Sequence, residues 1–462
     1  MGEALWTAEM VVAATGGRPV GPDWTATGVS IDTRTLEPGD LFAPLIDRRD
    51  GHDFIEAAFE AGAAATLSMR PLAPGVPGVI VSDTFAALRD LGRVGAGRAA
   101  FRCAITGSVG KTSVTAMTAR IFKALGRAHA PDRSFNNHIG VPLTLARTPG
   151  VTERLVAEIG MNAPGEIAPL SKLTRPHVGL ITAIGAAHLE GVGSMAGIVE
   201  EKTSLFAGLE RGGVAVIPAD GPYADAVRTR AGRFSIDRFV SFGTQADADV
   251  RVLRTQTEGE SLRSEIEVFG VRVGFRIGAL GAHWAVNGAA ALALAVLSGL
   301  DAQTAAQALS GYAPGAGRGA AVALRLEAGE ATLLDDAYNA NPTSVRAALA
   351  TLGARAPGPG GRRIAVLGDM LELGAEAERL HADLATPIRE AALDQVWCAG
   401  PLMGHLYAAL APQLRVKLDA SSEAAAESLA ASLRPGDVVL VKGSNASGVG
   451  RLADALKARF RT

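Results

Sequence analysis

Cysteine, aromatic residues, net charge and long apolar runs are all scarce in this chain of 462 residues. Its two cysteines, Cys103 and Cys398, each lie in an apolar, strand-like run, so we expect two buried thiols; a disulfide joining them is the less favoured alternative. Apolar stretches such as residues 288–300 are shorter than the ~20 residues of a membrane span. The formal net charge of −2 provides no basic field for nucleic acid or anionic membrane. We therefore expect no disulfide scaffold, no membrane span and no nucleic-acid partner.

The amino terminus also lacks the pattern of a secretory signal. It contains Glu3 and Glu9, and it has neither a basic first region nor a convincing cleavage site. Together with the two thiols, this favours a reducing, cytoplasmic location.

Apolar strand-like runs alternate with amphipathic helix-like runs, which is typical of an α/β protein with largely parallel sheets. The length fits two to four domains. We expect three: a small α/β domain at 1–98, a central parallel-sheet domain of the phosphate-loop type with helices on both faces at 99–314, and a doubly wound, Rossmann-like domain at 315–462. The clearest linker, residues 311–319, contains four glycines and a proline. Strands are expected at 101–106, 155–159, 178–184, 214–217, 239–242, 263–273, 332–335, 363–367, 395–399 and 438–441, and helices at 52–64, 84–98, 113–125 and 283–300.

The strongest local motif is T-G-S-V-G-K-T-S at 106–113, between a predicted strand and a predicted helix. Glycines let backbone N–H groups turn towards phosphate oxygens, and a helix N-terminus adds partial positive charge. Lys111 can reach the β and γ phosphates, and the Thr112 hydroxyl can ligate Mg²⁺. A complete phosphate loop has glycine where Ile105 stands, so a glycine-rich turn with a surface lysine is the alternative. We favour ATP binding by the residues of this loop: Gly107, Ser108, Val109, Gly110, Lys111, Thr112 and Ser113.

Further motifs follow in the order typical of one family. They are N-N-H-I-G-V-P-L at 136–143, Glu158 at a predicted strand end, His188 in I-G-A-A-H-L, and Lys202 in E-K-T-S-L-F. With the shortened loop, the chain resembles the Mur ligases and their relative folylpolyglutamate synthetase over about residues 30–445.

The resemblance implies a catalytic centre. In the family, residues matching Glu158 and His188 bind a second Mg²⁺, and the lysine matching Lys202 is carbamylated by CO₂. It therefore implies catalytic roles for Lys111, Lys202, His188 and Glu158, and metal ligation by Thr112, Glu158, His188 and Lys202. Mg²⁺ prefers oxygen ligands, and the carboxyl edge of a parallel sheet is where such folds bind ligands. Taken singly, each of these side chains could equally be solvated.

Other matches imply contacts with nucleotide and substrate. G-A-H-W-A-V-N at 281–287 resembles the adenine-contacting helix, with Trp284 in place of the usual asparagine, and implies a role for Asn287. The resemblance also implies Arg318 near the phosphates and Asp336 at the ribose. Substrate contacts are implied for Ser30, Asp32, Arg34, Asn136, Asn137, Asn339 and Asn341.

Residues 335–342, D-D-A-Y-N-A-N-P, resemble the family member that joins D-alanyl-D-alanine to UDP-N-acetylmuramoyl-tripeptide. This implies a monomeric ATP- and Mg²⁺-dependent amide ligase of peptidoglycan precursor synthesis that acts through an acyl phosphate. Residues 1–98 would hold the UDP end, and residues 315–462 would bind the dipeptide. The alternatives are another Mur ligase, a folylpolyglutamate synthetase, or a nucleotide-binding protein without chemistry.

Overall fold

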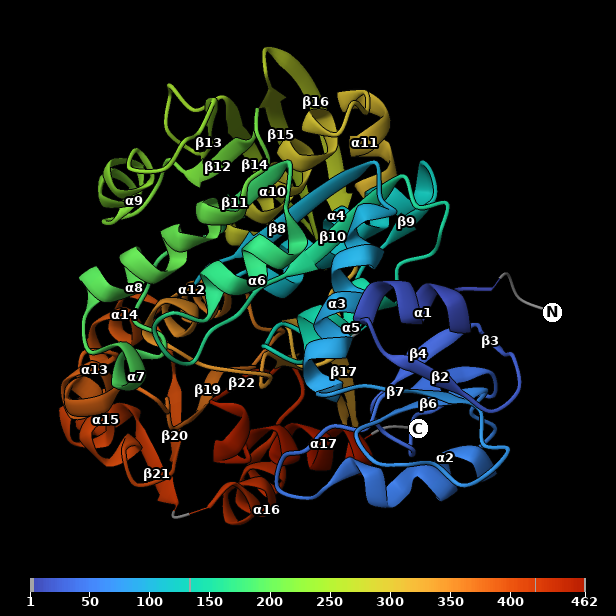
Figure 1. Ribbon diagram of the computed structural model, residues 1–462. Helices are drawn as coiled ribbons and strands as arrows, with labels where there is room; N and C mark the ends of the chain where they lie inside the picture. The colour runs from blue at the N-terminus through green and yellow to red at the C-terminus, as the bar shows by residue number, and fades with distance from the viewer. Residues whose placement is uncertain (1–3, 133, 420, 461–462) are drawn as a thin grey trace.

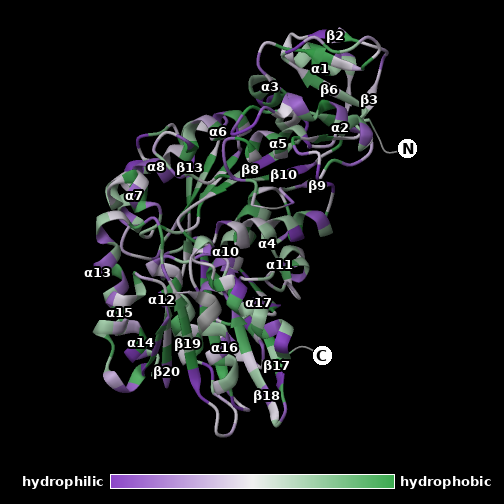
Figure 2. Cartoon of the chain, turned by 90° about the horizontal axis from the view of Figure 1, so that it is seen from below, coloured by the Kyte–Doolittle hydropathy of each residue, from purple (hydrophilic) through white to green (hydrophobic). Residues whose placement is uncertain are grey.

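Three sheet-based units follow one another in the computed structural model, which describes residues 4–132, 134–419 and 421–460. They contain five, nine and six main strands in chain order (Figure 1). Figure 2 shows the first and third units at opposite ends of the molecule, with the nine-stranded sheet between them. The predicted α/β class with largely parallel sheets is confirmed.

The first unit is a sheet of order β2-β7-β6-β5-β4, parallel except at β2. Buried Leu41, Leu67 and Leu88 contribute to its core. The helix predicted over 52–64 is shorter, because a 3-10 turn precedes it. The elements are β1 (Trp6–Thr7), α1 (Ala8–Thr15), β2 (Arg18–Val20), β3 (Thr25–Ala26), β4 (Gly28–Ser30), β5 (Asp40–Phe42), η1 (Gly51–Phe54), α2 (Ile55–Glu60), β6 (Ala65–Ser68), β7 (Gly78–Ile80) and α3 (Thr84–Gly97).

The central unit is a sheet of order β16-β15-β14-β13-β12-β11-β8-β10-β9, parallel from β14 to β9. Helices α4, α10 and α11 pack on one face and α6, α8 and α9 on the other, as predicted. The elements are β8 (Phe101–Thr106), α4 (Lys111–Ala124), β9 (Ala128–His129), α5 (Gly140–Ala146), β10 (Arg154–Glu158), α6 (Ile167–Thr174), β11 (Val178–Ile181), α7 (Leu189–Val192), α8 (Met195–Thr203), η2 (Ser204–Gly208), β12 (Val214–Pro218), α9 (Ala224–Ala231), β13 (Arg238–Gly243), β14 (Val250–Glu258), β15 (Ser261–Val268), β16 (Val271–Ile277), α10 (His283–Leu297) and α11 (Ala302–Leu309).

One predicted strand of the central unit is wrong. Residues 263–273 are not a single strand, because the chain reverses at Phe269 and Gly270, which both have positive φ (49° and 84°). Two consecutive residues of positive φ suit a tight hairpin turn, so β15 and β16 pair antiparallel. The strand β14 was not predicted, because its exposed half is rich in polar residues.

The third unit is a sheet of order β17-β18-β22-β19-β20-β21, parallel except at the edge strand β17. Strands β17 and β21 were not predicted. Helices cover both faces, as the two core clusters show. The elements are β17 (Ala320–Leu326), β18 (Gly329–Asp335), α12 (Pro342–Gly353), β19 (Arg363–Gly368), η3 (Gly374–Glu376), α13 (Ala377–Ala382), α14 (Ala385–Glu390), β20 (Gln395–Ala399), α15 (Met403–Ala409), η4 (Pro412–Leu414), β21 (Arg415–Asp419), α16 (Ser422–Ser432), β22 (Val438–Lys442), η5 (Asn445–Ser447) and α17 (Val449–Phe460).

The first and central units meet where α3 packs closely on α5. A Cβ at Gly95 would lie 2.0 Å from the Leu145 carbonyl oxygen, so only glycine permits this approach. Arg98 donates to the carbonyls of Thr148 (2.8 Å) and Leu5 (2.9 Å) and stacks over the Trp6 ring. The joint therefore combines close helix packing with buried hydrogen bonds.

Both cysteines are buried free thiols, as predicted, and burial raises the pKa of Cys398 to about 12. Among the described residues, no helix combines the length and apolar character that a membrane crossing requires.

Asp83→Ala tests the capping of α3. Asp83 accepts hydrogen bonds from the backbone N–H groups of Phe85 (2.8 Å) and Ala86 (3.0 Å) at the start of the helix. We expect the substitution to lower the free energy of unfolding by about 1 kcal/mol, measured by urea denaturation. In the control, Asp90→Ala removes only the exposed Asp90–Arg93 pair, which should cost no more than a few tenths of a kcal/mol. An equal loss in both variants would contradict the capping role.

Candidate active site

The phosphate loop joins β8, which lies between β11 and β10 in the central sheet, to α4. Gly107 (φ 145°) and Gly110 (φ 84°) both have positive φ. A Cβ at Gly107 would lie 2.0 Å from the Thr182 hydroxyl, and one at Gly110 would lie 2.9 Å from Asn287 Oδ1. Two further segments, at 182 and 287, therefore pack directly on the loop, and both glycines are needed for its path.

Segment 182–185 braces the loop through hydrogen bonds. The Thr182 hydroxyl donates to the Val109 carbonyl at 2.5 Å, and Ser108 Oγ donates to the Gly185 carbonyl at 2.9 Å. Lys111 Nζ donates to the Gly107 carbonyl at 2.7 Å, which folds this side chain back across the loop. Burial lowers the pKa of Lys111, although nearby Glu158 opposes the shift.

Glu158 is a buried carboxylate at the end of β10, and its two oxygens differ in their partners. Oε1 accepts from Asn136 Nδ2 (2.7 Å), Thr112 Oγ1 (3.1 Å) and Ser134 Oγ (3.1 Å). Oε2 is buried and has no hydrogen-bond partner. An unpaired buried carboxylate oxygen is costly, so this atom fits contact with a cation.

Lys202 on α8 is fully buried, and its Nζ has no hydrogen-bond partner. Burial, and then the charge of Lys111, hold the pKa of Lys202 well below its usual range. The neighbouring Glu201 is engaged elsewhere, because its carboxylate accepts from the backbone N–H groups of Gly165 and Ile167. A buried, unpartnered amine with a lowered pKa is thus held within electrostatic range of Lys111.

His188 meets the third unit directly. It has a left-handed backbone (φ 57°), and its Nδ1 lies 2.6 Å from Glu372 Oε2, at an angle unlike that of a good hydrogen bond. Burial lowers the pKa of His188, which favours the neutral ring. In addition, the Glu190 N–H donates to the Glu372 carbonyl at 3.1 Å. The loop that carries His188 is therefore bound to the loop that carries Glu372.

The predicted nucleotide residues come from three elements. Asn287 lies on α10 beside Gly110, and the Arg318 guanidinium lies 3.8 Å from the centre of the Tyr338 ring. Asp336 Oδ2 accepts from Lys442 Nζ at 2.7 Å, while burial raises the pKa of Asp336. Trp284 is 3% exposed and packs near the rings of its neighbours, so its place is in the core.

The predicted substrate asparagines all make local hydrogen bonds as well. Asn136 holds Glu158, and Asn137 Oδ1 accepts from the Gly140 N–H (2.8 Å). Asn339 Oδ1 accepts from Ala340 N–H, and Asn341 caps α12 in a capping box. The structure thus gives each asparagine a structural contact at the edge of the site.

Ser30, Asp32 and Arg34 lie in the first unit, apart from this constellation. Ser30 Oγ donates to the Asp32 carbonyl, and Arg34 pairs with Asp32, whose pKa the Arg34 hydrogen bond lowers. The Arg34 side chain is 84% exposed. These residues form a local turn in the end unit of Figure 2.

A cleft of about 320 Å³ lies between the central and third units. Ser108, Lys111 and His188 line it from one side, and Asn339, Glu372 and Ser444 line it from the other. The phosphate loop therefore faces residues of another unit.

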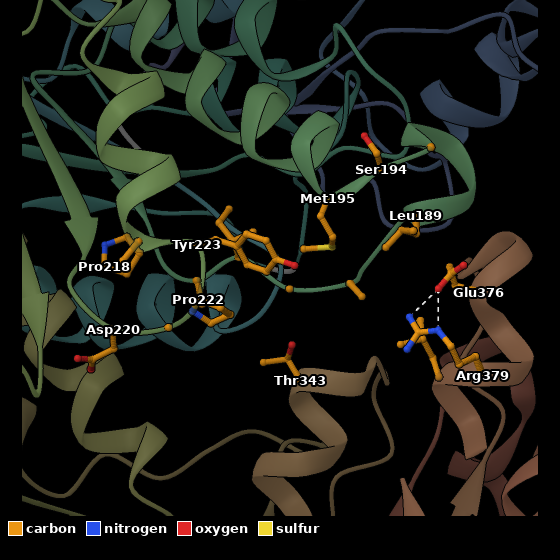
Figure 3. Close-up of a pocket in the computed structure, with 18 residues that line it drawn as sticks. Leu189, Ser194, Met195, Pro218, Asp220, Pro222, Tyr223, Thr343, Glu376 and Arg379 are labelled. Atoms are coloured by element: carbon orange, nitrogen blue, oxygen red, sulfur yellow. Dashed lines mark hydrogen bonds and ion pairs between the residues drawn. The ribbon is translucent and has the colours of Figure 1, made fainter. Parts of the chain in front are cut away.

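A larger cavity of about 660 Å³ lies beside the segment 183–186, which follows β11 (Figure 3). Tyr223, Met195 and Leu189 face it from the central unit, and Thr343 and Arg379 from the third. Residues 184–186 line this cavity while Ala187 and His188 line the cleft, so one loop separates the two spaces.

The residues present fit Mg²⁺ only in part. Within the described ranges, no three His, Cys, Asp or Glu side chains form a cluster that could hold a metal ion. The buried free oxygen of Glu158 and the adjacent Thr112 hydroxyl are suitable oxygen ligands. Oxygens from phosphate groups, and an oxygen-bearing group on Lys202, would complete such a site.

Several residues at the site were missed by the sequence analysis, namely Ser134, Thr182, Glu372 and Lys442. Ser134 and Thr182 act through hydrogen bonds between distant segments, for which the sequence has no signal. Glu372 lies in the loop that follows β19, and Lys442 is the last residue of β22. Their position at the carboxyl edge of the third sheet is the signal that could have found them.

Comparison with known proteins identifies the class to which this fold and site belong. Residues 105–295 match the Mur ligase middle domain, and residues 317–445 match the Mur ligase, glutamate ligase domain. The chain belongs to the Mur ligase family.

Among individual relatives, the chain is similar to the UDP-N-acetylmuramoyl-tripeptide–D-alanyl-D-alanine ligase of Bacillus subtilis (strain 168). The two are 36% identical over 388 residues, which is 81% of this chain and 80% of that protein. The crystal structure of MurF from Acinetobacter baumannii superposes with a TM-score of 0.86 at 28% identity, over 98% of this chain and 99% of that one. The structure of MurF ligase from Thermotoga maritima in complex with ADP gives 0.79 at 26% identity, over 94% and 97%.

Lys111→Ala tests the phosphate loop. We expect ATP turnover to be lost and the fold to be kept, because the substitution removes the ammonium that folds back across this loop without changing a core side chain. Steady-state kinetics measure the turnover, and circular dichroism measures the fold. The control is Lys123→Ala, an exposed position on the same helix. Unchanged turnover in Lys111→Ala would refute the assignment.

Proposed function

We propose that this protein is an ATP-dependent amide ligase that joins D-alanyl-D-alanine to UDP-N-acetylmuramoyl-tripeptide in peptidoglycan precursor synthesis. One observation carries the proposal: Lys111 of the phosphate loop lies within electrostatic range of Glu158, His188 and Lys202, and Lys111 and His188 line a cleft whose opposite wall belongs to the third unit. The similarity to UDP-N-acetylmuramoyl-tripeptide–D-alanyl-D-alanine ligases over four-fifths of the chain supports this choice of substrates.

The first step is activation of a carboxylate by phosphoryl transfer. The terminal carboxylate of the tripeptide attacks the γ phosphorus of ATP, the bond to the β-phosphate oxygen breaks, and ADP leaves. Lys111 and the N–H groups at the start of α4 neutralise the charge on the transferred group. Arg318, in the linker, lies close enough to Lys111 to lower the Lys111 pKa, and its positive charge would also neutralise charge on the transferred phosphoryl group.

The second step forms the amide. The neutral amine of D-alanyl-D-alanine attacks the carbonyl carbon of the acyl phosphate, loses a proton, and phosphate leaves with its bonding electrons. Water would hydrolyse the acyl phosphate, so the cleft must be closed to solvent. The third unit supplies that closure through the contacts of Glu372 with the His188 loop.

Mg²⁺ and a carbamate at Lys202 belong to this proposal. Thr112, Glu158, His188 and Lys202 would hold metal, which supplies charge neutralisation on phosphate oxygens when bound. The neutral Lys202 amine would attack the carbon of CO₂ and release a proton, giving an anionic carbamate. What supports this step is the low pKa of the buried, unpaired amine, because only the neutral form is nucleophilic.

We further propose a division of labour among the units. Residues 1–98 hold the UDP end of the substrate, residues 99–314 bind ATP, and residues 315–462 bind the dipeptide. The substrate roles of Ser30, Asp32 and Arg34 in the first of these, and those of the asparagines near the cleft, are part of this proposal, as are a monomeric state and a cytoplasmic location.

Substrate dependence tests the proposed function. Phosphate release should require ATP, UDP-N-acetylmuramoyl-tripeptide and D-alanyl-D-alanine together, because the acyl phosphate turns over only when an amine accepts the acyl group. A coupled phosphate assay with each substrate omitted in turn measures this. Release with glutamate or diaminopimelate in place of the dipeptide would instead indicate another Mur ligase or a folylpolyglutamate synthetase.

Lys202→Ala tests the carbamate. The variant should lose activity and regain part of it with a short carboxylic acid such as acetate or formate, because the acid restores an anionic oxygen in the vacated space. The control variant Lys172→Ala, at an exposed position on α6, should keep full activity with or without the added acid. A fully active Lys202→Ala variant would contradict the role.

A further inference from the structure

Glu372 is held in a strained and well-fixed position at the domain interface. It lies in the loop after β19 with φ 63°, a left-handed conformation that costs energy for a residue with a side chain. Its carbonyl accepts from the Glu190 N–H, and the preceding Leu371 N–H donates to Ser444 Oγ at 2.9 Å. Both walls of the cleft therefore fix the backbone from which this carboxylate extends.

The Glu372 carboxylate reaches the reacting end of the cleft. Its Oε2 lies 2.6 Å from His188 Nδ1, and the residue lines the same space as Ser108 and Lys111. The side chain is nevertheless 58% exposed, so contact with His188 leaves part of the carboxylate free for another partner.

The charges around the cleft single out this residue. Of the described residues that line the cleft, Glu372 is the one carboxylate. Two other acidic groups at the site are engaged: Glu158 Oε1 accepts three hydrogen bonds inside the central unit, and Asp336 is paired with Lys442. A cationic group entering the cleft thus has a single anionic side chain along its walls.

The incoming amino substrate is such a cation. An α-amino group has a pKa of about 7.7–8.0, so at pH 7 the dipeptide arrives mainly as an ammonium. A carboxylate hydrogen-bonded to an ammonium gives a strong, directional contact. One proton of the ammonium would pass to the carboxylate, and the same contact would then aim the neutral nitrogen at the carbonyl that it attacks.

We propose that Glu372 binds the ammonium group of the incoming dipeptide and positions it for attack. The inference rests on the proposed function and adds the subsite of its second substrate. It assigns to the third unit a direct part in amine recognition, in addition to closing the cleft. Because the Glu190 N–H of the central unit donates to the Glu372 carbonyl of the third unit, the amine subsite is complete only when the two units are in contact.

The test separates the two half-reactions in the full-length enzyme. Hydroxylamine, a small neutral nucleophile, traps the acyl phosphate as a hydroxamate and needs no ammonium subsite. Glu372→Gln keeps the size of the side chain and a polar contact to His188 but removes the charge. We expect the KM for D-alanyl-D-alanine to rise roughly ten- to hundredfold, the loss typical of a charged hydrogen bond, with hydroxamate formation from ATP and tripeptide unchanged.

Two further variants make the result specific. Glu372→Asp retains the charge and should recover part of the loss in KM. Glu378→Gln removes an exposed carboxylate on α13, which does not line the cleft, and should leave both assays unchanged. An unaltered KM in Glu372→Gln, or an equal fall in hydroxamate formation, would overturn the inference. Absence of hydroxamate with the unaltered enzyme would instead contradict the acyl phosphate, and thus the proposed function itself.

Discussion

The electrostatic interactions of Lys111 are the constraint on which the site depends. Glu158 favours the Lys111 ammonium, whereas the charge of Lys111 adds to the lowering of the Lys202 pKa that burial causes. Lys202 is fully buried and its Nζ has no hydrogen-bond partner, and an unpartnered buried polar group costs free energy. In the proposed function, a triphosphate at Lys111, a cation at Glu158 and an anionic carbamate on Lys202 would each offset part of this cost.

The geometry behind this constraint comes from strand order. Strands β11, β8 and β10 are adjacent and parallel, so the loops after residues 106, 158 and 181 leave the same edge. The phosphate loop, Glu158 and the Thr182–His188 segment are thereby brought together from distant positions. The third unit then adds Glu372, Asn339 and Ser444 as the opposite wall, so the cleft exists only between units.

Parts of the fold and of the candidate site were predictable from the sequence, for identifiable physical reasons. The phosphate loop has a local pattern, and strands β8 and β20 are apolar runs whose bounds were predicted to the residue. The strands β14, β17 and β21 and the hairpin at Phe269 were not predicted: β14 and β21 contain interleaved polar residues, and β17 is an alanine-rich run that directly follows the linker. The contacts of Ser134 with Glu158, of Thr182 with Val109 and of Glu372 with His188 were not predictable either, since they form only through tertiary packing. Burial places the Trp284 ring in the core, a position that its motif alone does not reveal.

The central claim is that this cleft activates a carboxylate by phosphorylating it. Tripeptide labelled with oxygen-18 in its terminal carboxylate tests this most directly, in a complete reaction with ATP and D-alanyl-D-alanine. If the carboxylate attacks the γ phosphorus, mass spectrometry should find one labelled oxygen in each released phosphate. Phosphate that carries no label would show that no acyl phosphate forms, and would contradict the account.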